Sequence, residues 1–463
     1  MSKSYTITPG RLERDNGNIG LSAHVRNRFS RFRVGMQVFA IAVSTKLRDD
    51  GVFVFCGRGL RRLFLEICWV CGLPVAGALH LSGVRRLAVK VEHIGHLAEE
   101  INTLLKEVNL GLLPKNHWFV LAPPRLVSNS HLLDYWKQHV RVIQHPLACR
   151  VLLSLTRRYL AVSDVSRYTA DYFRTQEIYR VCRLWRDRPP ILKLTTEDEE
   201  WGAHMLECLG MQRDQWFVCV HVREGGFLPH NEIIQAHRNA DVMKYVDAMQ
   251  EIVRRGGVCI RMGDTTMKHL PPIPNVIDYA HHPLKSARLD VILAAKSRFF
   301  LGCTSGLAFV ATAFGVPTAL ANMIPIAARG IGYRDISIPK LIRRHLDGGY
   351  LSLQEIFALG AANYFFSHQY SAAGLDVVEN ESMDILDMVL DMFDLLEGKL
   401  SENAEDAMLL ARYENCFKPG DYGYGSVSGI SRRFLRRRRE LLFGAKMADG
   451  LVIERTGVSG SRH

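Results

Sequence analysis

The sequence predicts an α/β protein built on two parallel sheets that are covered by helices. Short apolar strands alternate with helix-length amphipathic segments over residues 85–200, and the alternation resumes over residues 201–395. Such alternation is typical of parallel α/β units. The composition agrees with this class, because 463 residues with 48% hydrophobic and 23% charged side chains suit a folded chain of more than one domain.

The first of these regions, residues 85–200, is expected to be an N-terminal Rossmann-like domain. The apolar runs predict strands over residues 87–91, 118–122 and 140–143. Amphipathic periodicity predicts helices over residues 97–108 and 130–139. Residues 188–196, which contain a pair of prolines, are the expected linker to the second domain.

The second region, residues 201–395, repeats the pattern more clearly. Strands are expected over residues 216–221, 258–261, 275–279, 298–302 and 316–321. Helices are expected over residues 240–254, 289–295 and 307–314, and residues 350–395 are expected to be helical. Gly256 and Gly257 stand where the first of these helices should end.

Helical extensions are expected at both ends of the chain. Residues 1–84 should form a polar arm and then an apolar helical segment; its longest apolar run, residues 63–81, is broken by Pro74 and is shorter than the roughly 20 apolar residues of a spanning helix. An interfacial segment and a buried helix pair both remain open for this run. Residues 396–463 should hold a crossing helix and a basic tail.

The basic tail has three possible explanations. Residues 432–439 are rich in arginine, and the helix they form could lie on an anionic membrane, bind RNA or simply be exposed. An apolar stripe of Ile430, Phe434, Leu441 and Leu442 is expected beside it. The acidic residues Asp384, Asp387, Asp391 and Asp394 are expected to form a solvated helix face.

Charge and cysteine content suggest where the protein acts. The net charge of +12 favours anionic partners, such as phosphorylated substrates, a membrane surface or nucleic acid. Ten scattered cysteines without a secretory signal predict reduced thiols and a cytoplasmic protein, with peripheral attachment to the inner membrane left open. The Cys68–Cys71 pair is expected to be structural and buried, because no second pair stands at zinc-binding spacing.

Three polar clusters follow predicted strands of the second domain. They are residues 221–226, 261–264 and 302–306. The carboxyl ends of parallel strands meet at the edge of the sheet where ligands bind. Arg223 has the planar guanidinium that suits a phosphate, Gly225 lets a ligand approach the backbone, and Thr304 to Gly306 precede a helix and could hold an anion.

These clusters predict a site for a phosphorylated ligand without a metal. The sequence has no Asp-x-Asp pair, so no metal or other cofactor is expected, and fixed cations and backbone amides should hold the phosphates. Asp264 could contact a ribose or close a turn, and Tyr279 could stack on a base or belong to the core. The candidate ligand-binding residues are His221, Arg223, Gly225, Arg238, Arg261, Gly263, Asp264, Tyr279, Thr304, Ser305 and Gly306.

The first cluster carries a resemblance to known families. His221-Val222-Arg223 resembles the H-x-R motif of the fucosyltransferase superfamily, in which the arginine holds the β-phosphate of GDP. The wider sequence is similar to a bacterial family of predicted glycosyltransferases from surface-polysaccharide loci, over about residues 87–325. The matching segments are 238–241, 245, 256–257, 261–264, 278–281, 285–286, 290, 299–302, 305–306 and 314–317, with weaker matches at 94–97 and 128–129.

The resemblance implies a fold and an activity. The fold is GT-B, two Rossmann-like domains that face each other across a cleft. The activity is sugar transfer, for which the resemblance fixes neither donor nor acceptor. With the missing Asp-x-Asp pair, we expect metal-independent transfer of a sugar of hexosyl or fucosyl type, from a nucleotide sugar that could be GDP-linked to a glycan or lipid-linked acceptor. Glu224-Gly225-Gly226-Phe227 stands where fucosyltransferases have a second arginine and an aspartate, so GDP and fucose are not implied.

Inverting transfer would need a general base, and two residues are candidates. They are Glu224 and His96, although Glu224 could instead pair with an arginine and His96 could cap a helix. Other functions also remain open. A nucleotide-sugar epimerase and a non-catalytic nucleotide- or glycan-binding assembly protein would use the same fold, while binding of nucleic acid, which is not expected, would rest on charge alone.

Overall fold

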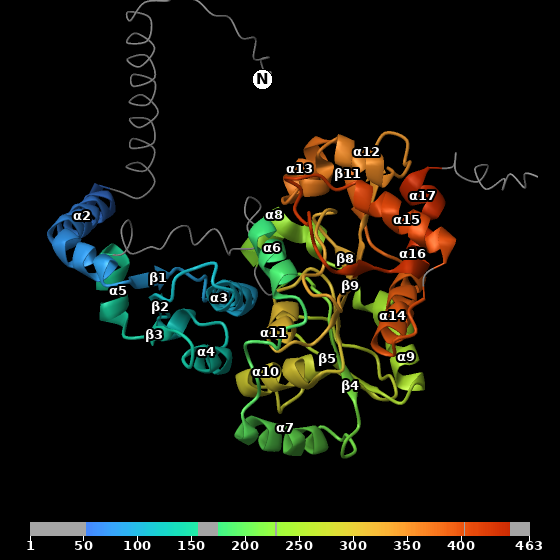
Figure 1. Cartoon of the computed structure of the whole chain (residues 1–463), viewed down its shortest axis with the longest axis horizontal. Helices are drawn as coiled ribbons and strands as arrows, with labels where there is room; N and C mark the ends of the chain where they lie inside the picture. Colours follow the sequence, from blue (N-terminus) through green and yellow to red (C-terminus); the bar gives the residue numbers. More distant parts are fainter. Residues whose placement is uncertain (1–51, 156–174, 227–228, 402, 445–463) are drawn as a thin grey trace, which may run out of the picture. The chain divides into compact units, whose positions relative to one another are not determined.

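The computed structural model describes residues 52–155, 175–226, 229–401 and 403–444 (Figure 1). The chain forms two compact units, Met1–Leu73 and Pro74–His463. All the strands of the described ranges belong to the second unit, so both predicted sheet regions lie within one compact body.

The smaller sheet has three parallel strands in the order β1-β2-β3. These are β1 (Val84–Leu87), β2 (His117–Leu121) and β3 (Arg141–Ile143), with α3 (Ile94–Asn109), α4 (Ser130–Trp136) and α5 (Pro146–Leu155) in the connections and after the last strand. The Asn129 side chain accepts a hydrogen bond from Leu132 N at 2.8 Å and so starts α4. Leu87, Leu97, Ile101 and Val120 are buried between this sheet and α3.

The larger sheet has seven strands in the order β12-β9-β8-β7-β4-β5-β6, and every neighbouring pair is parallel. The chain enters the sheet at β4, runs outwards through β5 and β6, and returns to begin the other half at β7, on the opposite side of β4. Because the direction of winding reverses between β4 and β7, the topological switch point of the sheet lies there. The strands are β4 (Phe217–His221), β5 (Val258–Arg261), β6 (Val276–Ile277), β7 (Phe300–Gly302), β8 (Thr318–Met323), β9 (Ile336–Pro339) and β12 (Gly429–Ile430).

Helices cover both faces of the larger sheet, and each face has its own core (Figure 1). On one face lie α9 (Val246–Arg254) and α14 (Ser382–Leu396); on the other lie α10 (Ala287–Lys296) and α11 (Leu307–Ala313). The second core also contains Leu87, Ile101 and Val120, so it continues into the smaller sheet. The remaining helices are α6 (Thr175–Trp185), α7 (Thr196–Cys208), α8 (Pro229–Gln235), α12 (Leu353–Ala358), α13 (Ser367–Ala372), α15 (Ala404–Asn415), α16 (Arg432–Arg437) and α17 (Arg439–Phe443).

The predicted α/β class with two parallel sheets is confirmed, and most predicted strands lie within three residues of the observed ones. The prediction that residues 350–395 are helical is wrong in part. This segment contains β11 (Leu375–Val378), which pairs antiparallel with β10 (Leu341–Arg344). Gly374, with a φ of +67°, ends α13 and lets the chain turn into β11.

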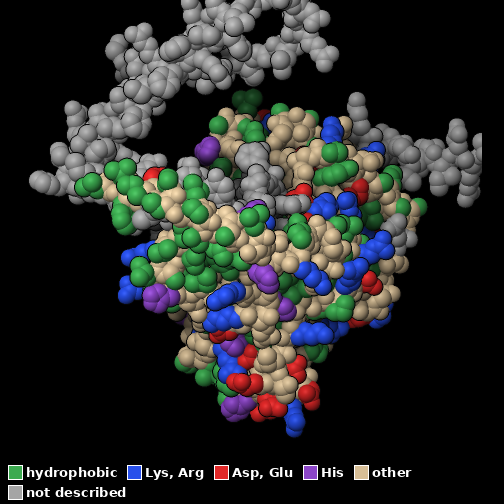
Figure 2. Space-filling model, turned by 60° about the vertical axis from the view of Figure 1, so that its left-hand side comes forward, with side chains coloured by type: hydrophobic (Ala, Val, Ile, Leu, Met, Phe, Trp, Pro, Cys, Tyr) green, Lys and Arg blue, Asp and Glu red, His purple; other side chains and the backbone are tan. Residues whose placement is uncertain are grey.

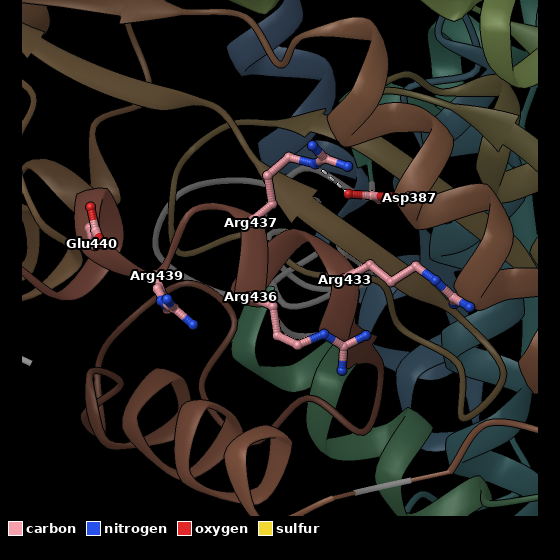
Figure 3. Close-up of a pocket in the computed structure, with 6 residues that line it drawn as sticks. All are labelled: Asp387, Arg433, Arg436, Arg437, Arg439 and Glu440. Atoms are coloured by element: carbon pink, nitrogen blue, oxygen red, sulfur yellow. Dashed lines mark hydrogen bonds and ion pairs between the residues drawn. The ribbon is translucent and has the colours of Figure 1, made fainter. Parts of the chain in front are cut away.

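The arginine-rich tail is paired within the protein. Arg438 makes two hydrogen bonds of 2.8 and 2.9 Å to Asp384, and the side chains of Arg433 and Arg437 pair with Asp391 and Asp387. Figure 3 shows the Arg437–Asp387 pair in an open hollow of about 530 Å³ between α14, α16 and α17. The expectation of a solvated acidic face is therefore wrong.

The apolar stripe beside these arginines is not a free surface either. Ile430, Phe434 and Leu442 are buried in the core on the face of the larger sheet that α9 and α14 cover, and Leu441 packs against that core. The tail helix thus has its apolar side inside the protein and its charges neutralised by carboxylates of α14 and α15. These contacts explain both the arginine run and the apolar stripe, so neither feature requires a membrane or an RNA as a partner.

The N-terminal apolar segment forms one long helix, α2 (Val52–Leu81), with Pro74 inside it. Leu60, Leu63, Phe64, Ile67 and Val70 are exposed along it, so it is not a buried helix pair. Among the described helices, none is long and apolar enough to cross a membrane. Figure 2 shows hydrophobic side chains gathered on part of the face that it displays. Cys71 is also exposed, contrary to the expectation of a buried cysteine pair.

Candidate functional site

Two of the three predicted clusters meet at the switch point of the larger sheet. His221 ends β4 and pairs in register with Gly302, which ends β7. A side chain at Gly302 would lie 3.1 Å from the carbonyl oxygen of His221, so glycine allows this close approach. The backbone N–H of Arg223 donates to the sulfur of Cys303 at 3.1 Å, which holds the two loops together.

Arg223 and Arg238 lie over these loops. Arg223 donates through Nη1 to the side-chain oxygen of Asn239 at 2.7 Å and to the carbonyl of Gln235 at 2.8 Å. Arg238 donates through Nη2 to the carbonyl of Thr304 at 2.8 Å, which ties the segment after α8 to the loop after β7. Arg223 also forms an ion pair with Glu232 at 3.3 Å and is 16% exposed, so it faces the protein more than the solvent.

One further cation, Lys340, lies beside the two arginines. Lys340, 3% exposed, donates to the carbonyl of Asn239 at 2.6 Å, and burial lowers its pKa to about 8. Burial also lowers the pKa of Arg238 to about 10, with Arg223 adding to the shift. The pKa of His237 falls to about 3, through burial and then through the charges of Arg238, Lys340 and Arg223. We call Arg223, Arg238 and Lys340 the cationic cluster.

Several buried polar atoms at this edge of the sheet have no hydrogen-bond partner among the described residues: His221 Nδ1, Arg238 Nε and Ser305 Oγ. Buried polar groups are nearly always paired in proteins, so such a concentration requires an explanation. Burial and the charge of Arg261 lower the pKa of His221 to about 4, which keeps its ring neutral. An anion bound here would give Arg238 Nε and Ser305 Oγ an acceptor and would offset the charge of the cationic cluster.

The N-terminus of α3 packs directly against this edge. A Cβ atom added to Gly95 would lie 2.6 Å from the Cα of Gly306, and one added to Gly306 would lie 2.8 Å from the N of Gly95. The pKa of His93 is lowered by burial first and then by His96, with Arg238 contributing. His93 is therefore in the electrostatic neighbourhood of the cationic cluster, and the ring of His96 lies 5.6 Å from the ring of His93.

His96, one of the two predicted bases, is held by a buried carboxylate. Its Nδ1 lies 2.6 Å from Oε1 of Glu100, one helical turn further along α3. Glu100 is 1% exposed, and burial raises its pKa. The other ring nitrogen of His96, Nε2, makes no hydrogen bond to the described part of the chain, and the side chain is 22% exposed. Histidine–carboxylate pairs of this kind fix the ring and its tautomer.

Glu224 and Arg261 pair with each other instead of facing the cluster. Oε1 of Glu224 accepts from Arg261 Nη2 at 3.2 Å, and Oε2 accepts from the backbone N of Lys268 at 2.8 Å. Arg261 is fully buried and also donates to Asp278 at 2.8 Å. The expected alternative for Glu224, pairing with an arginine, is thus what the structure shows, and Arg261 holds the loop after β5 together.

Three other residues that were predicted to bind the ligand belong instead to the core or to a turn. Tyr279 is fully buried in the core, so its ring is not available to stack on a base. Asp264 accepts from the N and Oγ1 of Thr266 at 2.8 and 2.5 Å, which closes a turn. Gly263 has a φ of +152° at this turn, and a side chain there would collide with the sulfur of Met267. Gly225 does lie beside the site, because a Cβ there would be 3.1 Å from Glu232.

Sequence reasoning missed Lys340, His237 and Glu100. Lys340 directly follows β9, so the strand-end pattern that identified the other clusters could have found it. His237 precedes Arg238 in a 3-10 helix, η3 (Ala236–Arg238), that no periodicity predicted. Glu100 lies one turn from His96 on the same helix face, a spacing that could have suggested the pair.

Comparisons with known proteins reveal only distant similarity. No family model matches the chain, and no curated protein matches it. Among solved structures, a glycosyl transferase of family 9 from Veillonella parvula matches with 13% identity and a TM-score of 0.23, over 48% of this chain and 60% of that chain. The ADP-heptose lps heptosyltransferase II of E. coli matches with 12% identity and a TM-score of 0.33, over 51% and 84%.

The E. coli heptosyltransferase WaaC with ADP matches with 12% identity and a TM-score of 0.29, over 55% of this chain and 90% of that one. The chain thus spans under two thirds of the length of the Veillonella protein. Similarities this weak do not establish the family or the activity of the chain.

Proposed function

We propose that this protein is a glycosyltransferase that binds the diphosphate of a nucleotide sugar at the carboxyl ends of β4 and β7. The observation that carries the proposal is the cationic cluster at the switch point of the larger sheet, together with the unpartnered buried atoms Arg238 Nε and Ser305 Oγ. Open parallel sheets bind ligands at this place, and buried positive charge without full compensation favours an anion.

The cluster would act on the leaving group. When the bond between the anomeric carbon and the diphosphate oxygen breaks, the bond electrons remain on that oxygen, and negative charge develops there. Guanidinium and ammonium groups held in place at the phosphates stabilise such charge, so a metal there is not needed. Arg223 would exchange its single carboxylate partner, Glu232, for the more highly charged diphosphate.

We propose His96 as the base, because Glu100 holds its Nδ1 and the helix that carries it packs against Gly306. Its Nε2 would take the proton of the acceptor hydroxyl as the oxygen attacks the anomeric carbon, which inverts the configuration there. Glu100 would keep the Nδ1 proton in place and stabilise the imidazolium that forms, as a positioning residue. Glu224 is not proposed as the base, because its carboxylate is occupied by Arg261 and Lys268.

The acceptor and the location form a finer part of the proposal. A glycan or lipid-linked acceptor of surface-polysaccharide synthesis would be met at the cytoplasmic face of the inner membrane, and a GDP-linked sugar is one candidate donor. The exposed apolar side chains of α2 would then rest in the membrane interface. Binding to RNA lost its main support when the arginines of α16 proved to be paired.

A nucleotide panel tests the site. The melting temperature of the full chain is measured with ADP, GDP, UDP and their sugar conjugates, because a ligand selective for the native state raises it. We expect at least one diphosphate series to raise it, and Arg238→Ala to abolish the rise. The matched control is Arg254→Ala. Arg254 is the last residue of α9 and is 69% exposed, so its removal should leave the rise in melting temperature unchanged. No response to any nucleotide would refute the proposal.

Turnover then separates the alternatives. Release of the nucleoside diphosphate that depends on an added glycan or lipid-linked acceptor supports transfer. Isomerisation of the nucleotide sugar without an acceptor would identify an epimerase. Binding lost in Arg238→Ala, but without turnover on any acceptor, would identify a non-catalytic binding protein.

A further inference from the structure

A second cluster of coordinating side chains lies on the other side of Arg261. One ligand atom each from His269, Asp278 and His281 lies within 4.8 Å of the other two. Asp278 directly follows β6, His281 ends the 3-10 helix η5 (Tyr279–His281), and His269 lies in the connection between β5 and β6. Their spacing matches no metal motif in the sequence, so only the folded chain brings them together.

The three side chains lie near one another, but the two rings would have to rearrange to hold one ion. The two imidazole rings are stacked with centroids 3.7 Å apart and planes inclined by 24°. Oδ2 of Asp278 lies 3.9 Å from Nδ1 of His269 and 4.0 Å from Nε2 of His281. Bonds of about 2.0–2.2 Å to a tetrahedral ion separate ligand atoms by about 3.4 Å. Oδ2 of Asp278 therefore needs to come roughly half an ångström closer to each ring nitrogen, and the stacked rings need to splay apart. His269, which is 77% exposed, is free to make this movement.

Two features indicate that the trio is prepared for a ligand. The side chain of His281 is 13% exposed. Its Nε2 is buried and has no hydrogen-bond partner among the residues that the structure describes. Asp278 is oriented by two hydrogen bonds, from Arg261 Nη1 at 2.8 Å to Oδ1 and from Leu270 N at 3.2 Å to Oδ2. Carboxylates that bind metals are usually fixed in this way by neighbouring donors.

The local charge permits a cation. Arg261 carries one positive charge but contacts two carboxylates, those of Asp278 and Glu224. The three groups together are negative by one unit, and neutral imidazoles add nothing. Two ring nitrogens with one carboxylate oxygen suit Zn²⁺, Co²⁺, Ni²⁺ or Fe²⁺, whereas Mg²⁺ and Ca²⁺ prefer oxygen ligands alone.

We propose that His269, Asp278 and His281 bind one divalent transition-metal ion of the Zn²⁺ type, with water completing the coordination. The ion would fasten the connection between β5 and β6. His269 follows Lys268, whose backbone N–H binds Glu224 and whose carbonyl accepts from Arg261. The metal would thus stabilise the loop beside the candidate site; no step of sugar transfer is assigned to it, and the site stands whether or not the protein is a transferase.

Cobalt binding tests the site without an activity assay. The full chain is stripped with a chelator, dialysed and titrated with Co²⁺, and the visible absorption of the bound ion and its displacement by Zn²⁺ are recorded. We expect one strong equivalent that His269→Ala and His281→Ala each weaken by at least tenfold. His269→Ala is the decisive variant, because an exposed side chain can be removed without disturbing the core.

The matched control is His345→Ala, which removes another surface histidine that contacts an aspartate, Asp376, at 2.8 Å. It should bind Co²⁺ like the unchanged protein. Far-ultraviolet circular dichroism confirms that each variant is folded. If the unchanged protein binds no Co²⁺, or if His269→Ala and His281→Ala bind it with unchanged stoichiometry and affinity, the proposal is wrong.

Discussion

The ion pair between Arg223 and Glu232 makes a specific prediction about nucleotide binding. If Arg223 must leave Glu232 to bind a diphosphate, then removing the carboxylate's charge strengthens binding. Glu232→Gln is the suitable change, because glutamine keeps an oxygen that can accept the hydrogen bond from Asn239 Nδ2, now 2.6 Å long. The guanidinium of Arg223 would keep its contacts to Asn239 and Gln235.

The magnitude follows from the exposure of the pair. Arg223 and Glu232 are 16% and 26% exposed and 3.3 Å apart, which is a partly buried and not closely bonded pair. The free energy lost when such a pair is broken should lie between two limits. Exposed surface pairs contribute roughly 0–1 kcal/mol, and breaking a buried pair costs about 3–5 kcal/mol. We take about 1–2 kcal/mol, which corresponds to nucleotide binding tighter by roughly 5- to 30-fold.

Isothermal titration calorimetry at fixed ionic strength measures this change. The nucleoside diphosphate that most raises the melting temperature is titrated into the unchanged chain, into Glu232→Gln and into the control Glu381→Gln. Glu381 pairs with Lys244 at the surface and is 58% exposed, so its neutralisation should alter the affinity by less than about twofold. Binding that is weaker in Glu232→Gln, or equally enhanced in both variants, would refute the idea that Glu232 competes with phosphate for Arg223.

Three further predictions concern other buried charges. Glu100→Gln should lower kcat by about 10²- to 10⁴-fold with little change in nucleotide affinity, because His96 loses the carboxylate that orients it; steady-state kinetics and calorimetry on the same variant test this. Diphosphate affinity should fall as the pH rises through about 8, where Lys340 loses its proton, and this fall should be absent in Lys340→Met. Because the folded pKa of Lys340 is depressed, its contribution to stability should increase between pH 8 and its ordinary value of 10.5. Arg438→Ala should lower the free energy of unfolding by about 2–3 kcal/mol in urea melts, because Asp384 is fully buried and loses a bidentate partner.

Each of these has an outcome that contradicts it. Equal losses of kcat and affinity in Glu100→Gln would mean a structural role for Glu100 alone. The same pH profile in Lys340→Met would place the titrating group elsewhere. A change in unfolding free energy under about 0.5 kcal/mol in Arg438→Ala would show that the Arg438–Asp384 pair contributes like an exposed one.

The sequence could predict the sheets because their signals are local. Strands of the larger sheet, such as residues 258–261, are short apolar runs bounded by glycine or charged residues, and they form where expected. The strand-end rule also placed His221 and Gly302 correctly at one edge. Pairing across the chain is not local, and there the predictions failed: the acidic face of α14 was expected in solvent because nothing in residues 384–394 shows that arginines some 50 positions later will cover it.

The candidate site was predictable to the same extent. Residue type and strand ends identified Arg223 and Ser305, and the family resemblance added Arg238, but neither could decide which charges are already paired within the protein. Arg223 and Arg261 look alike in sequence, since each follows or ends a parallel strand. Only the contacts distinguish them: Arg261 pairs with two carboxylates, Glu224 and Asp278, and with a carbonyl, although its Nε has no partner among the described residues, whereas the cationic cluster around Arg223 retains an excess of positive charge.

The contact between Gly95 and Gly306 joins the two parts of the proposed reaction, diphosphate binding and removal of the acceptor proton. The diphosphate would be held by the loop after β7, and the proton would be taken by His96 of α3, more than 200 residues earlier in the chain. With a Cβ at Gly95 only 2.6 Å from a backbone atom of the other segment, no side chain fits there without moving the helix from the loop. A base must lie within hydrogen-bond reach of the attacking hydroxyl, so a shift of about 1 Å at this contact would separate nucleotide binding from catalysis. The two glycines therefore set the distance on which the proposed transfer depends.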